Sequence, residues 1–173
     1  MIMRYHYPMP QIKPDISNKN IGLYDGTCPI CIREFVTSGR TKLLHLDDFC
    51  FIDRNDSSIL VVNGHSISAE MRLSLSILEH IAFPNEEVVR FSRRFLFDYM
   101  ESDLRLSDGD FITRVTMLKY PEHFHIHAYV LPFKDESGAI VPENIYGDIY
   151  YLHHPSVPDY VCEIVNSPFN LSL

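Results

Sequence analysis

The sequence predicts an α+β fold in a single domain. Several short apolar runs have the length and the two-residue alternation of β-strands, and one segment has the periodicity of an amphipathic helix. The chain has 173 residues, of which 46% are hydrophobic and 12% aromatic, so it can bury one core of ordinary size. No internal repeat and no linker composition divides it.

The first half of the chain predicts an arm followed by strands. Residues 1–20, with three prolines and few apolar runs, are expected to form an extended N-terminal arm that lies on the body or pairs with another subunit. Residues 43–53 are typical of one strand, or of two short strands around a turn at Asp47-Asp48. Residues 59–62 (Ile-Leu-Val-Val) predict a buried strand. Polar residues 54–58 between them predict a turn.

The second half predicts one long helix and three more strands. The spacing of Met71, Leu75, Leu78 and Ala82 predicts a helix over residues 69–82, and Pro84 would end it. The remaining elements are expected to be strands at residues 95–100, 111–118 and 123–130, with turns at residues 107–110 and 135–138. We therefore expect an arm (1–20), a domain (21–139) and a C-terminal extension packed on that domain (140–173).

Charge and composition exclude several classes of function. The net charge of −8 argues against broad nucleic-acid binding, because such binding needs Lys and Arg to neutralise phosphates. No signal peptide is recognisable at the N-terminus, and no run approaches the ~20 apolar residues of a membrane span. We therefore expect a cytoplasmic protein without a membrane partner. In such a reducing compartment a C-x-x-C pair is more often metal-binding or redox-active than a disulfide.

The most informative segment is His-Phe-His-Ile-His-Ala-Tyr-Val at residues 123–130. In a strand, successive side chains point to opposite faces, so His123, His125 and His127 would share one face. Clustered imidazoles indicate metal binding, nucleophilic or acid–base chemistry, or a bound anion. If His123 binds a metal, His125 is free to attack phosphorus, and His127 could orient it or stabilise charge on phosphoryl oxygens.

A zinc site can be assembled from residues far apart in the chain. Tetrahedral zinc takes four N or S ligands, commonly a C-x-x-C pair and two histidines. Cys28 and Cys31 supply the pair, and His65 and His123 complete a plausible set. The alternative is that the two cysteines are simply buried thiols in a turn. The other two cysteines, Cys50 and Cys162, lie in apolar contexts that predict core positions.

Together these segments resemble the histidine triad (HIT) superfamily. The family signature, His-φ-His-φ-His-φ-φ, matches residues 123–129. Cys28-Pro-Ile-Cys31-Ile32 is similar to the C-x-x-C-x-I of zinc-containing members. Residues 47–53 resemble the acidic-then-apolar strand pair that ends in Asp, and residues 59–65 resemble the strand that ends in His before the first long helix. The four matches occur in the family's order.

The resemblance implies a fold, a chemistry and a set of residue roles. The implied fold is a HIT-like antiparallel sheet with one long helix packed on it, often as a homodimer. The implied chemistry is hydrolysis or transfer of a nucleotidyl group at an α-phosphate, so the expected partner is a nucleotide or nucleotide conjugate. His125 matches the nucleophile, and Asp53 and Ile32 match the ribose-binding acid and an apolar contact to the base. The implied ligands of one structural zinc are Cys28, Cys31, His65 and His123.

The residues alone do not decide the role of Asp53 or whether the protein is catalytically active. Asp53 could accept hydrogen bonds from a ribose, or belong to a solvated turn. The approach to the triad, residues 117–122, has neither the glycines nor the Gln of the family, and Pro121 lacks a donor N–H. A catalytically inactive nucleotide sensor or interaction module is therefore the alternative. A cupin-like metal oxygenase is disfavoured, because no acid follows His127 before Asp135.

Overall fold

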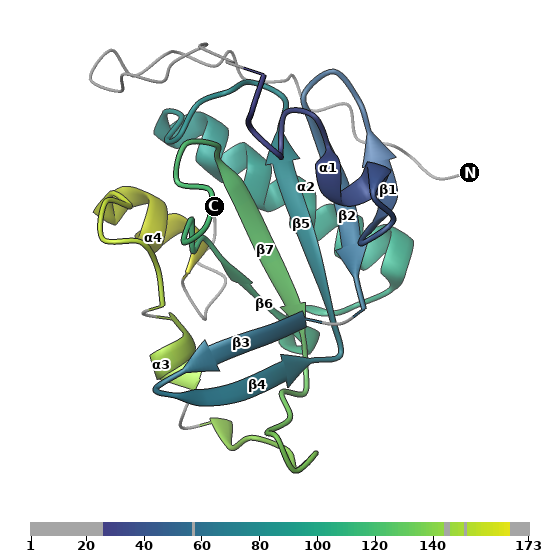
Figure 1. The fold of residues 1–173 in the computed structure, drawn as a ribbon, viewed down its shortest axis with the longest axis vertical. Helices are drawn as coiled ribbons and strands as arrows, with labels where there is room; N and C mark the ends of the chain where they lie inside the picture. The colour runs from purple at the N-terminus through teal and green to yellow at the C-terminus, as the bar shows by residue number, and fades with distance from the viewer. Residues whose placement is uncertain (1–25, 57, 144–145, 151, 167–173) are drawn as a thin grey trace.

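The computed structural model describes residues 26–56, 58–143, 146–150 and 152–166, so the expected arm at 1–20 lies outside the described residues. An antiparallel five-stranded sheet has the strand order β1-β2-β5-β7-β6 (Figure 1). Its strands are β1 (Lys42–Leu46), β2 (Cys50–Asn55), β5 (Met71–Ile77), β6 (Phe111–Arg114) and β7 (His125–Val130). Strands β3 (Ser58–Val62) and β4 (His65–Ala69) form a separate hairpin. The helices are α1 (Glu34–Thr37), α2 (Glu86–Leu104), α3 (Tyr146–Tyr150), α4 (Asp159–Val165) and the 3-10 turn η1 (Asp108–Asp110). The predicted α+β class is confirmed.

The helix predicted over residues 69–82 is wrong, because residues 71–77 of that segment form the strand β5. Apolar residues alternate strictly with Arg72, Ser74 and Ser76 through this strand. β5 pairs with β2 on one side and β7 on the other. Alternation with a period of two suits a central strand whose two faces meet different surroundings. The helical spacing of its apolar residues was coincidental.

The strand predicted over residues 95–100 is also wrong, because it lies inside α2. Buried positions of this helix recur every three or four residues and include Val88, Val89, Leu96 and Met100. Asn85 caps the helix, since its side chain accepts a hydrogen bond of 3.0 Å from the Val88 N–H. The period of 3.6 residues therefore outweighed the strand propensity of an aromatic run.

The other predicted strands differ in extent. Residues 43–53 form two strands around a turn, in which the Asp47 carboxylate accepts hydrogen bonds from the Phe49 and Cys50 N–H groups. The strand expected at residues 59–62 is β3, but Ile59 and Val61 are 66% and 61% exposed, so only one of its faces is buried. The strand expected at residues 111–118 ends at Arg114.

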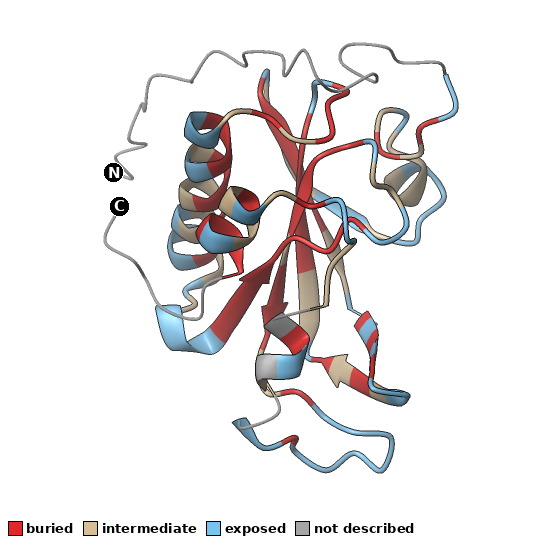
Figure 2. Cartoon of the chain, turned by 90° about the vertical axis from the view of Figure 1, so that its left-hand side faces the viewer, coloured by how far each residue is buried: buried red, intermediate tan, exposed pale blue. Residues whose placement is uncertain are grey.

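Helices cover one face of the main sheet. Figure 2 shows α2 and α4 on the same side of the strands. The principal core lies between these two helices and the sheet. This core takes apolar side chains from both helices and from the alternate positions of every main strand except β1, with Cys50 among them. The opposite face carries the histidines. None of the described helices has the length and apolar character of a membrane span.

Candidate functional site

Four side chains that could hold a metal ion meet at one end of the sheet. Cys28 and Cys31 lie in the turns before α1, His80 follows β5, and His123 precedes β7. One nitrogen or sulfur atom from each lies within 4.8 Å of the others. The Nδ1 atom of His123 is 3.5 Å from Cys28 Sγ and 3.3 Å from Cys31 Sγ. Cys31 Sγ is also 3.2 Å from His80 Nδ1.

The orientation of His123 suits a metal ligand. Its Nε2 lies 2.7 Å from the carbonyl oxygen of Ile77, so Nε2 carries the proton and donates it there. Nδ1 then has a lone pair directed at the two cysteines. Burial lowers the pKa of His123 to about 4, which keeps the ring neutral. Sulfur and nitrogen ligands of a tetrahedral zinc ion lie about 3.6 Å apart, close to the observed separations.

The structure does not bring His65 to this cluster, contrary to the prediction. His65 begins β4 opposite Val62 and is exposed, and the β3–β4 hairpin stands at the other end of the sheet from α1 (Figure 1). His80 takes its place and is buried. The alternation of β5 could have identified His80, because a strand that ends at Ile77 brings the next histidine to the end of the sheet where His123 precedes β7.

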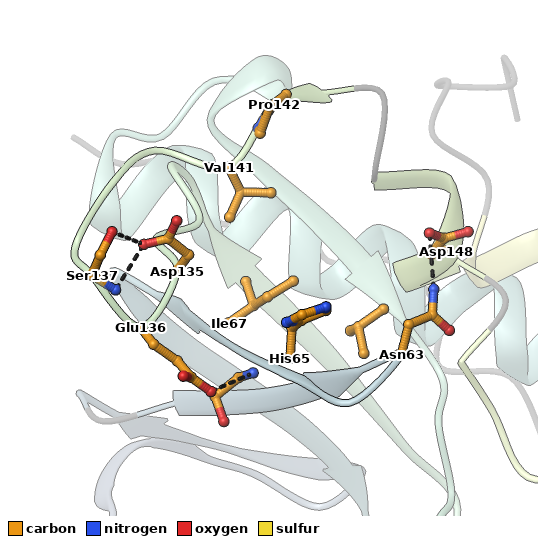
Figure 3. Close-up of a pocket in the computed structure, with 11 residues that line it drawn as sticks. Asn63, His65, Ile67, Asp135, Glu136, Ser137, Val141, Pro142 and Asp148 are labelled. Carbon is orange, nitrogen blue, oxygen red and sulfur yellow. Dashed lines mark hydrogen bonds between the residues drawn. The ribbon is translucent and has the colours of Figure 1, made fainter.

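His65 instead lines a separate cavity of 450 Å³ at the hairpin (Figure 3). Apolar side chains such as Ile67 and Val141 lie at its centre, and acidic residues surround them. The Asp148 carboxylate accepts a hydrogen bond from Asn63, and the Asp135 carboxylate accepts hydrogen bonds within its own turn. The acidic groups of this cavity are therefore engaged locally.

A second group of polar residues crosses the face of the sheet opposite the helices. Strand register places Asp53 of β2, Ser74 of β5 and His127 of β7 in one row. The adjacent row contains Ser76 and His125. Because alternate residues share a face, both rows lie on the same side. The sheet therefore places Asp53 on the same face as the two histidines, with Ser74 of β5 between Asp53 and His127.

His125 is held as a neutral imidazole with one defined free nitrogen. Its Nδ1 lies 2.7 Å from the backbone carbonyl of His123 and donates a proton to it. Nε2 therefore carries the lone pair. The residue is 5% exposed, and burial lowers its pKa to about 4. A neutral imidazole whose lone pair has a fixed direction is suited to nucleophilic attack.

His127 contacts both Ser74 and His125 on this face. Its Nδ1 is 2.8 Å from the Ser74 hydroxyl, and its ring centroid is 5.0 Å from that of His125. Burial, followed by the positive charge of Arg72, lowers the pKa of His127. When the Ser74 hydroxyl donates to Nδ1, Nε2 carries the proton and can donate it to a ligand.

Asp53 is buried within β2, so the alternative of a solvated turn does not hold. It is 7% exposed. Burial raises its pKa, opposed by the nearby Thr41 hydroxyl and by the positive charge of Arg72. Ile32, the predicted base contact, lies in the turn after Cys31 and is 45% exposed. Sequence reasoning did not identify Arg72, which belongs to the misassigned strand β5.

Comparisons with known proteins identify no relative: no family model, no curated protein and no solved structure matches this chain.

Proposed function

We propose that the protein is a nucleotide hydrolase or nucleotidyltransferase that acts at an α-phosphate through a nucleotidyl-histidine intermediate. The observation that carries this proposal is the environment of His125. Its Nδ1 donates to the His123 carbonyl, which leaves the Nε2 lone pair as the reactive position beside His127. The HIT-like motifs of the sequence support the same chemistry.

The reaction takes place in two displacements. His125 Nε2 attacks the α-phosphorus, a phosphorus–nitrogen bond forms, and the bond from phosphorus to the leaving group breaks. The His127 Nε2–H donates a hydrogen bond to the departing atom, which takes its proton from solvent, so His127 stays neutral throughout. Water or another acceptor then attacks phosphorus, the phosphorus–nitrogen bond breaks and returns its electron pair to His125, and the acceptor's proton passes to solvent. Hydrolysis releases a nucleoside monophosphate and restores the neutral His125.

We further propose that the Cys28, Cys31, His80 and His123 cluster holds zinc in a structural role. Two sulfurs and two imidazole nitrogens are a ligand set that zinc prefers, and four protein ligands leave no open position for water. The ion would link the turn before α1 to the ends of β5 and β7. Because His123 also accepts the Nδ1–H bond of His125 through its carbonyl, this link supports the orientation of the nucleophile.

The nucleoside is proposed to lie across β2 toward the turn after Cys31. Asp53 is placed to accept hydrogen bonds from ribose hydroxyls, and the exposed Ile32 offers an apolar surface for a base. An apolar slot of this kind rarely distinguishes purines from one another.

The direct test is turnover of nucleoside phosphoramidates, dinucleoside polyphosphates and nucleotide sugars, followed by chromatography. We expect release of a nucleoside monophosphate, and a rate for His125→Ala lower by about 10⁴-fold or more, as for the loss of other covalent nucleophiles. Normal turnover by a folded His125→Ala variant contradicts the mechanism.

A second function, nucleotide binding without catalysis, is motivated by the segment before the triad. Pro121 has no N–H to donate to a phosphate, and Glu122 is exposed to solvent. This alternative predicts thermal stabilisation by nucleotides, no turnover, and little effect of His125→Ala on binding.

A further inference from the structure

A positive charge lies among the polar residues of the histidine face. β5 alternates, so Arg72 shares that face with Ser74, and its register partner on β7 is Tyr129. The Arg72 guanidinium lies near the Tyr129 hydroxyl. Its charge acts on Asp53, His125 and His127, so it lies within electrostatic range of each of these side chains.

Arg72 is half-buried, yet none of the described carboxylates forms an ion pair with it. Its Nε is inaccessible to solvent and has no hydrogen-bond partner among the residues that the structure describes. Asp53, an acid whose charge Arg72 influences, makes no ion pair with it. A partly buried guanidinium that lacks a paired anion is costly unless a ligand supplies one.

Arg114 adds a second cation on the same face. It is opposite His127 in the register of β6 and β7, and its side chain is fully buried. One of its terminal nitrogens donates a hydrogen bond to the Leu152 carbonyl, which anchors the guanidinium. Two guanidiniums on one face give this region a positive potential although the whole chain carries a net charge of −8.

We propose that Arg72 is the principal phosphate-binding side chain of this site and that Arg114 reinforces it from the side of His127. This inference rests on the proposed function and adds the residue that holds the reacting group. The Arg72 guanidinium would donate hydrogen bonds to non-bridging phosphoryl oxygens and orient phosphorus toward His125. Arginine suits this task because its planar fork of N–H donors matches two phosphate oxygens at once.

The assignment explains how the chain could bind phosphate without the glycine-containing loop typical of the HIT family. In that arrangement backbone N–H groups contact the phosphate, whereas residues 117–122 lack glycine and include Pro121. A side chain on a central strand is held by its neighbours on both sides, so it can provide a rigid donor in place of a loop. The expected ligand is thus a phosphate ester with at least one non-bridging anionic oxygen.

The test is calorimetric binding of inorganic phosphate and of the four common nucleoside monophosphates to the full-length, metal-loaded protein. We expect Arg72→Gln to weaken binding of the preferred monophosphate by about 10- to 100-fold, as for loss of a charge-assisted hydrogen bond. Arg72→Lys should bind with intermediate affinity, because it keeps the charge and loses the fork. Arg90→Gln, which removes an exposed charge on α2, is the matched control and should bind like the wild type.

Unaltered affinity in Arg72→Gln overturns the proposal, and so does the absence of binding by wild type to all five probes. Circular dichroism and metal content establish that each variant is folded. Turnover is measured separately with His125→Ala. Binding that depends on Arg72, without turnover, would support the phosphate site and reject the catalytic function. Turnover that depends on His125, without an effect of Arg72 on binding, would support the catalytic function and reject the phosphate site.

Discussion

One hydrogen bond determines which atom of His123 can meet a metal. Because Nε2 donates to the Ile77 carbonyl, Nδ1 is left with a lone pair beside both cysteines. The sequence identified three of the four residues in this cluster, since C-x-x-C and the first triad histidine are recognisable patterns. The fourth residue, His80, could be identified only if residues 71–77 were correctly predicted to be a strand. His80 has no motif of its own and becomes significant only as the histidine that follows a strand.

Substitution of His80 distinguishes the observed cluster from the predicted one. His80→Ala removes one of the four proposed ligands, so we expect zinc affinity to fall by about 100-fold or more. His65→Ala, the matched control on the hairpin, should retain one zinc per chain. Competition with a chromogenic chelator, together with elemental analysis, measures both. Loss of zinc from His65→Ala but not from His80→Ala would refute the assignment.

Asp53 provides a pH-dependent test of its burial. Its pKa is higher in the folded chain than in the unfolded chain, so its ionisation opposes folding as the pH rises above about 4. We therefore expect Asp53→Asn to be more stable than wild type at pH 7, with a difference that shrinks as the pH is lowered toward 4. Urea unfolding of both proteins at several pH values gives this difference. A difference that grows on acidification would show that the ionised form is favoured by folding.

At the scale of elements, two periodicities competed in the sequence. The α+β class and the histidine strand could be predicted, because their patterns have one interpretation, whereas residues 43–53 fitted either one strand or the two strands around Asp47 that form. β5 and α2 were exchanged, because the apolar residues of β5 also fit a helical spacing and the aromatic residues of α2 favour a strand. β5 forms a strand because it pairs with β2 on one side and with β7 on the other. α2 forms a helix because its buried residues lie along one side of the helix.

Leu96 tests the packing of α2 on the sheet. It is fully buried in the main core, so Leu96→Ala should lower the free energy of unfolding by about 2 to 5 kcal/mol. Arg90→Ala on the exposed side of the same helix should change it by about 0.5 kcal/mol or less. Denaturant titration compares the two. Equal effects would indicate that residues 86–104 do not pack as this helix.

At the scale of the whole molecule, the C-terminal extension completes the core beside α2. α4 contributes Val161, Ile164 and Val165 to that core. Beyond the end of α4, the Asn166 side chain accepts a hydrogen bond of 2.7 Å from the Val115 N–H. Thr113 donates a second bond of 2.8 Å to the Val165 carbonyl. The sequence predicted that the extension packs on the domain, but it did not predict these two hydrogen bonds, because their partners lie about fifty residues earlier in the chain.

Substitution of Asn166 tests how strongly the C-terminal extension is attached to the rest of the domain. Asn166→Ala leaves a buried N–H of Val115 without this acceptor, so the free energy of unfolding should fall by about 1 to 3 kcal/mol. Glu163→Ala on the exposed side of α4 should be nearly neutral. Thermal unfolding checks both. A neutral Asn166→Ala would mean that the docking does not depend on this bond.

The most direct test of the central claim is detection of the covalent intermediate. Wild-type protein is mixed with each of the proposed nucleotide substrates, quenched in alkali to preserve a phosphorus–nitrogen bond, and analysed by mass spectrometry. We predict a nucleotidyl group on His125 that appears before product accumulates and is absent from His125→Ala. Product release with no adduct on any histidine, or an adduct on a residue other than His125, would contradict the account.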